Sequence, residues 1–84
     1  MSPERAYSSS HAALGRAIRD LRVQREFPQS ALAQRAGIDV SYLSGLERGR
    51  RNASWTVILA LANALGVKPS ELVKRAEQSI SNQP

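Results

Sequence analysis

Cysteine is absent from this sequence of 84 residues, and histidine occurs once, as His11. These two scarcities exclude disulfide frameworks, cysteine nucleophiles and cysteine-rich or multi-histidine metal sites. No apolar run approaches the roughly 20 residues that a membrane helix needs, and the N-terminal segment MSPERAYSSS lacks the apolar core of a signal peptide. We therefore expect a cytoplasmic protein that contacts no membrane and holds no metal or cofactor.

Acidic residues and lysines are also few. The chain has 12 basic against 7 acidic residues, which gives a net charge of +5 and a pI near 10.8, and ten of the twelve basic residues are arginine. The planar guanidinium fork of arginine matches phosphate oxygens and the guanine edge, so this composition favours a nucleic-acid partner. Many basic proteins bind no nucleic acid, so the charge alone does not decide the function.

The sequence shows no alternating strand pattern and no internal repeat. Apolar residues instead recur at helical spacing in five stretches that are separated by proline, glycine and cap residues. The five stretches are 10–26, 28–37, 39–49, 54–66 and 69–78. We expect Asp39 and Ser54 to cap their helices by accepting hydrogen bonds from backbone amides. The pattern predicts an all-α, compact five-helix domain over residues 10–78, with a flexible arm at 1–9 and a flexible tail at 79–84.

Residues 29–48 carry a specific pattern of small and aliphatic side chains. Counted from the first of them, a small residue is fifth (Ala33), glycine is ninth (Gly37), and leucines are fifteenth and eighteenth (Leu43 and Leu46). Two helices that cross steeply over a short turn need a small side chain at the crossing, and glycine can take the positive φ that ends the first of them. This pattern resembles the helix-turn-helix of the Cro and phage-repressor (XRE-type) family.

The flanking segments support the same resemblance, which covers about residues 13–73. The family's typical motifs occur here as IRDLR, PQSALA, SGLERG and ALGV. The chain departs from the family at Glu26, where glycine is usual, at Pro28, where serine or threonine is usual, and at Ala53, where proline is usual. The segment YLSGLERGRRN also resembles the controller proteins of restriction-modification systems. The resemblance implies a lambda-repressor-like domain whose third helix enters the DNA major groove while the second crosses the phosphate backbone.

The third helix and the arginine-rich loop after it would then form the DNA-binding surface. Around the helix, Ser41, Ser44, Gly45 and Arg48 lie opposite the leucine face. Gly45 lowers helix propensity, which indicates close approach of the backbone either to DNA or to a neighbouring helix. The expected base-contacting residues are Val40, Ser41, Tyr42, Ser44 and Arg51. The expected phosphate-contacting residues are Gln29, Arg48, Arg50 and Asn52.

Two further sets of residues have expected structural roles. The family commonly pairs an arginine and a glutamate beneath the recognition helix, and these positions correspond to Arg22 and Glu47; a surface pair of Arg22 with Glu26 is the alternative. One short helix contacts few base pairs, so we expect a homodimer on a palindromic operator, with recognition helices about 34 Å apart. The expected dimer interface consists of Trp55, Val67, Leu72 and Val73. Trp55 alone has a second interpretation, as cover for the core.

These features predict a sequence-specific, double-stranded DNA-binding regulator of transcription. The alternative is a protein-interaction module of the same fold, such as an antitoxin or adaptor. The clustered placement of Gln29 and the loop arginines favours DNA. An enzyme is not expected, because the carboxylates are scattered and no nucleophile with a base occurs. We also expect no small-molecule ligand, since 84 residues leave no room for a separate ligand-binding domain.

Overall fold

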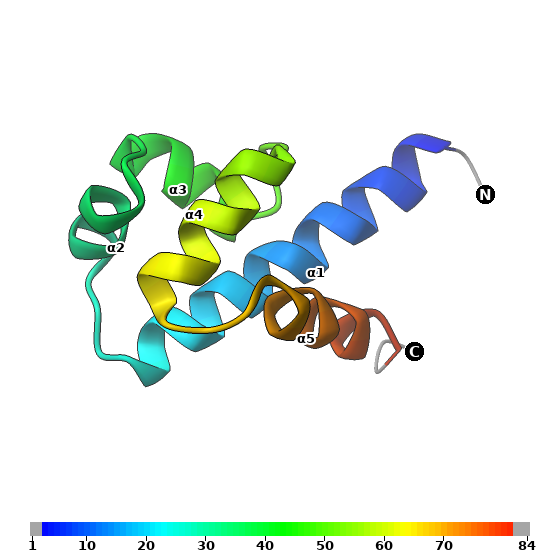
Figure 1. Ribbon diagram of the computed structural model, residues 1–84. Helices are drawn as coiled ribbons and strands as arrows, with labels where there is room; N and C mark the ends of the chain where they lie inside the picture. The colour runs from blue at the N-terminus through cyan, green and yellow to red at the C-terminus, as the bar shows by residue number, and fades with distance from the viewer. Residues whose placement is uncertain (1–2, 82–84) are drawn as a thin grey trace.

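The computed structural model describes residues 3–81, and within this range the chain forms five α-helices and no strand. The helices are α1 (Pro3–Gln24), α2 (Gln29–Ala36), α3 (Val40–Glu47), α4 (Trp55–Leu65) and α5 (Pro69–Ser81). Helix α1 runs the length of the domain, α5 packs along it, and α2, α3 and α4 complete the fold (Figure 1). The predicted all-α, five-helix fold is confirmed, with α2 and α3 as the helix-turn-helix.

The core that joins these helices is almost entirely aliphatic, as the scarcity of aromatic residues requires. Every helix contributes to it, because each has apolar residues at intervals of three and four positions. The largest side chains that are fully buried are Ile18, Leu21, Leu32, Leu43, Leu61, Leu65 and Leu72. Ala33, the small residue at the crossing of α2 and α3, is 2% exposed. The core therefore fixes α3 through its leucine face, as the sequence pattern predicts.

Both ends of the domain extend further than the sequence pattern indicates. Helix α1 begins at Pro3 rather than near Ser10, because proline suits the first helical position and no proline or glycine lies between the two. Helix α5 continues to Ser81, and the hydroxyl of Ser79 accepts a hydrogen bond of 2.7 Å from Nε of Arg16. The expected boundaries at residues 10 and 78 thus differ from the helix ends. The rest of the predicted arm and tail, at 1–2 and 82–84, lies outside the described residues.

The predicted helix caps have different outcomes. The side chain of Ser54 accepts a hydrogen bond of 3.2 Å from the backbone N–H of Val57, so the predicted cap of α4 is confirmed. Asp39 occupies the N-cap position of α3 but makes no side-chain cap hydrogen bond. Its carboxylate instead accepts from the hydroxyl of Ser41, so the expected cap is wrong. A short acceptor can bond either a nearby hydroxyl or a backbone amide, and here the hydroxyl occupies it.

The turn between α1 and α2 contains the departure at Glu26. The N–H of Phe27 donates to the carbonyl of Arg22 at 3.1 Å, and the N–H of Glu26 donates to the carbonyl of Val23 at 3.0 Å. These two hydrogen bonds form a Schellman motif, whose left-handed residue is usually glycine. Here that residue is Glu26, with φ of 59°. The turn keeps the geometry that the motif requires although its side chain makes that geometry unfavourable.

Helix α3 lies unusually close to α1. A Cβ at Gly15 of α1 would be 2.7 Å from the carbonyl oxygen of Glu47, at the end of α3. A Cβ at Gly49, just beyond α3, would be 2.8 Å from Cα of Ala12. Real Cβ atoms do not approach backbone atoms so closely, so the absence of a side chain at Gly15 permits the crossing. Gly15 was missed by the sequence analysis, although a glycine inside an apolar helical pattern is a signal for close packing.

Candidate nucleic-acid interface

Helix α3 presents one buried and one exposed face, as its sequence period predicts. Leu43 and Leu46 are 0% and 2% exposed and pack on the core. On the other side, Ser41 and Arg48 are exposed, and Val40 is 43% exposed. The leucine side of the helix thus packs on the domain, and the opposite side is exposed and can contact a partner.

The charged pair expected beneath α3 is present. Arg22 of α1 donates through Nε to Oε2 of Glu47 at 2.7 Å and through Nη2 to Oε1 at 3.0 Å. The third guanidinium nitrogen, Nη1, donates to the carbonyl oxygen of Phe27 at 2.8 Å. The side chains of Arg22 and Glu47 are 13% and 3% exposed. The contact is therefore a bidentate, largely buried bridge, and not the surface pair of Arg22 with Glu26 that was the alternative.

Gln29, an expected phosphate contact at the start of α2, joins the same bridge. Its Nε2 donates to Oε1 of Glu47 at 3.0 Å, and the residue is half-buried. The bridge therefore connects α1, the turn after it, α2 and α3 through four hydrogen bonds. An amide nitrogen carries two hydrogens, so donation to Glu47 orients Gln29 without using its whole donor capacity.

The segment after α3 folds back onto the exposed face of that helix. Nη2 of Arg48 donates to the hydroxyl of Ser44 at 2.7 Å. The hydroxyl of Tyr42 donates to the carbonyl oxygen of Asn52 at 2.5 Å, and Cζ of Arg51 lies 5.1 Å from the centre of the Tyr42 ring. Exposed residues of this segment are Arg48, Arg50, Arg51 and Asn52. The structure thus brings all the predicted base-contacting and phosphate-contacting residues except Gln29 onto α3 and the segment after it. We call this the α3 surface, and it consists of Val40, Ser41, Tyr42, Ser44, Arg48, Arg50, Arg51 and Asn52.

The residues expected in a dimer interface do not all reach the surface. Leu72 is 0% exposed, because it faces the core between the other helices, and its assignment to a dimer interface is wrong. Val67 and Val73 are half-buried. Trp55 is 61% exposed, so its second interpretation as cover for the core is wrong. Leu59, one turn further along α4 on the same side as Trp55, is 39% exposed.

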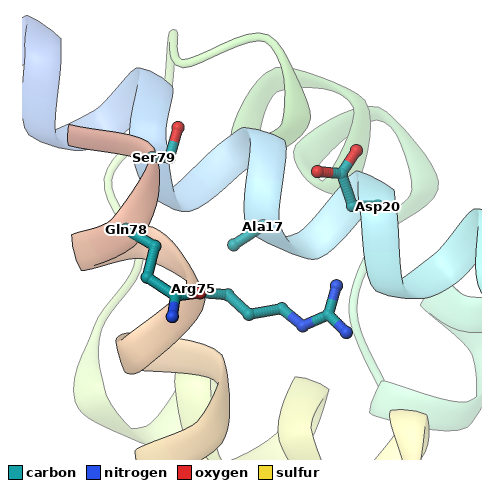
Figure 2. A pocket seen from close by; sticks show the side chains of 5 residues that line it. All are labelled: Ala17, Asp20, Arg75, Gln78 and Ser79. Atoms are coloured by element: carbon teal, nitrogen blue, oxygen red, sulfur yellow. The ribbon is translucent and has the colours of Figure 1, made fainter. Parts of the chain in front are cut away.

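Other candidate sites lie away from the α3 surface. A surface pocket of about 400 Å³ between α1 and α5 is lined by Ala17, Asp20, Arg75, Gln78 and Ser79 (Figure 2). Within residues 3–81, no group of three histidine, cysteine or acidic side chains lies close enough to hold a metal ion. In the same range no single helix is long and apolar enough to cross a membrane. Helices α4 and α5 taken together have the length and composition of a membrane span, but they are bent by 102° relative to each other.

Comparison with known proteins shows the family to which this chain belongs. The sequence profile of the family described as "Helix-turn-helix domain" matches residues 13–75, which is most of the chain. The chain therefore belongs to the helix-turn-helix domain family, and the resemblance predicted from the sequence is confirmed.

Individual relatives include repressors and controllers. The immunity repressor protein of Bacillus phage phi105 is 38% identical over 60 residues, which is 71% of this chain but only 42% of the repressor's length. The control protein C.BamHI of Bacillus amyloliquefaciens is 35% identical over 60 residues, 70% of this chain and 74% of that protein. The crystal structure of the restriction-modification controller C.AhdI of Aeromonas hydrophila has 44% identity and a TM-score of 0.73, and the match covers 74% of this chain and 94% of that one. The similarity to these two controller proteins thus covers about three quarters of the chain.

Proposed function

We propose that this chain is a transcription regulator that binds double-stranded DNA in a sequence-specific manner, with α3 in the major groove. The observation that carries the proposal is the α3 surface, where three exposed arginines, Arg48, Arg50 and Arg51, adjoin the exposed face of a helix that is anchored from below. Phosphates would bind to Arg48, Arg50 and Asn52, and to Gln29 beside the amides at the start of α2. Base edges would meet side chains from the set predicted above, which are Val40, Ser41, Tyr42, Ser44 and Arg51.

The names of the relatives agree with this role. One is an immunity repressor and two are control proteins, so they support a regulator and give no support to an antitoxin or adaptor. Proteins of this family are typically not enzymes, and we propose no catalytic activity for this chain. A regulator of this type acts where its operator is, and we therefore propose that the protein works in the cytoplasm.

The proposal includes a symmetric homodimer on a palindromic operator. A single eight-residue recognition helix meets only a few base pairs, so two copies about 34 Å apart would be needed to select a genomic site. The exposed pair of Trp55 and Leu59 on α4, together with Val67 and Val73, supplies an apolar surface for the second copy. Large exposed apolar side chains at helical spacing are typical of such contacts.

The proposal is tested by selecting binding sites from random DNA duplexes and then measuring affinity for the selected site over a range of salt concentrations. We expect a palindromic site and a steep fall in affinity with salt, because the bound arginines displace counterions. Arg50→Ala should weaken binding to selected and random duplexes alike and reduce the salt slope by about 1. Arg19→Ala is the matched control, because it removes one exposed arginine from α1, outside the α3 surface. Equal losses for both variants, or no selected site, would contradict the proposal.

A further inference from the structure

The atoms nearest to the glycine in the middle of α3 belong to the loop that follows this helix and not to a neighbouring helix. Glycine in a helix interior lowers the stability of the helix relative to alanine, so a reason for Gly45 is expected. The three atoms nearest to a Cβ at this position all belong to the side chain of Arg51: its Cγ, which would clash, and its Cβ and Cδ, each at 3.5 Å. Gly45 therefore makes room for the side chain of Arg51, which crosses the exposed face of α3.

Tyr42 holds the same arginine from the preceding turn of the helix. Its ring lies under the guanidinium of Arg51, with 5.1 Å between Cζ and the ring centre, a distance at which a cation–π attraction operates. Its hydroxyl donates to the backbone carbonyl of Asn52, the residue that follows Arg51. Tyr42 thus restrains both the side chain of Arg51 and the backbone beside it. We call Tyr42 and Gly45 together the Arg51 seat.

Helix α3 itself supplies no side chain that can distinguish a guanine by two hydrogen bonds. Its groove-facing residues include Val40 and Ser41, which are exposed, and Ser44, which is half-buried; their contacts with bases are single hydrogen bonds or methyl contacts. Arginine is the common bidentate partner of guanine O6 and N7 in the major groove. The loop after α3 places the guanidinium group of Arg51 on this exposed face of the helix. Arg48 is held differently, by a hydrogen bond from its guanidinium to Ser44.

We propose that the Arg51 seat holds Arg51 in place to recognise a guanine in the major groove, with Tyr42 and Gly45 as positioning residues. This inference rests on the proposed function, since it requires that α3 enters the groove. A free arginine side chain loses rotamer entropy when it is fixed, and prior restraint against the ring and the glycine reduces that loss on binding. The seat therefore contributes to sequence preference, whereas Arg50 contributes to general affinity.

Gly45→Ala is the decisive variant, because its effects on stability and on recognition should have opposite signs. Alanine favours a helix over glycine, and its methyl group displaces only a flexible exposed side chain, so thermal stability should be unchanged or higher. Binding-site selection with this variant should show a weaker preference for one guanine in each half-site. Affinity for the site selected by the unaltered protein should fall about tenfold, the range expected for loss of one bidentate base contact. Tyr42→Leu should weaken preference at the same base pair.

The role of Arg51 is tested by combining the variants. Arg51→Ala should lose preference at the same guanine, and adding Gly45→Ala to it should have no further effect. Replacing that guanine by 7-deazaguanine, which lacks the N7 acceptor, should weaken binding of the unaltered protein but not of Arg51→Ala. If Gly45→Ala weakens binding equally in the Arg51→Ala background, the glycine meets DNA directly and the seat is refuted. If Gly45→Ala leaves the selected sequence unchanged, the inference is wrong while the proposed function stands; if the unaltered protein selects no sequence, the proposed function itself fails.

Discussion

Breaking the buried bridge between Arg22 and Glu47 should destabilise the whole domain. In Arg22→Met the aliphatic stem is largely kept, but Glu47 loses the two guanidinium donors at 2.7 and 3.0 Å. Of the bridge, only the amide of Gln29 remains to serve a carboxylate that is 3% exposed. The carbonyl of Phe27 also loses its donor, so the turn between α1 and α2 is affected as well.

The magnitude follows from the burial of the pair. Leaving one member of a buried ion pair without its partner typically costs about 3–5 kcal/mol, because an uncompensated charge stays away from water. A chain of this length has a total stability of roughly 4–13 kcal/mol, so the loss is a large share of it. For a domain of this size the melting temperature should fall by roughly 12–40 °C.

The interaction is isolated by a double-mutant cycle of Arg22→Met, Glu47→Leu and the combined variant. Removing both charges exchanges the bridge for apolar contacts, and such exchanges are often neutral or stabilising. We therefore expect the combined variant to be more stable than Arg22→Met, as measured by urea and thermal unfolding. DNA affinity of Arg22→Met should fall where α3 is no longer held, although Arg22 need not touch DNA. A coupling energy near zero, or additive losses, would refute the view that the bridge is a buried unit.

Three further outcomes are expected from other positions. Glu26→Gly should raise the free energy of unfolding by about 1–2 kcal/mol, since φ of 59° is unfavourable for any residue with a Cβ. A lower free energy of unfolding in chemical denaturation would show instead that the Glu26 side chain stabilises the turn. Gly15→Ala should lower stability by about 1–3 kcal/mol, because its methyl would collide with the α3 backbone, and unchanged unfolding would mean that α1 and α3 separate at no cost. Trp55→Glu combined with Leu59→Glu should convert a dimer into a monomer in sedimentation and leave the melting of the monomer nearly unchanged, because both side chains are exposed; an undisturbed dimer would place the interface elsewhere.

The sequence by itself determined the local features of this protein. Helical periodicity identifies the buried side of α3, because Leu43 and Leu46 recur at the spacing that puts them on one face. Glycine and proline mark the turns, since their backbone preferences act within a few residues of the chain. The contact between Arg22 and Glu47 could also be predicted from the sequence. The family resemblance indicates that these two positions pair, and Glu47 lies on the same side of α3 as the buried leucines.

Only the tertiary structure decided which neighbour covers each face. The pattern of α5 could not distinguish Leu72, which is fully buried, from Val73, which is half-buried, because that distinction depends on how α5 lies against α1 and α4. Likewise, the side chain of Arg51 lies against Gly45 only because the loop turns back over α3. Local preferences set helices and turns, whereas contacts between separate segments arise from the packing of the whole chain, which a periodic pattern does not contain.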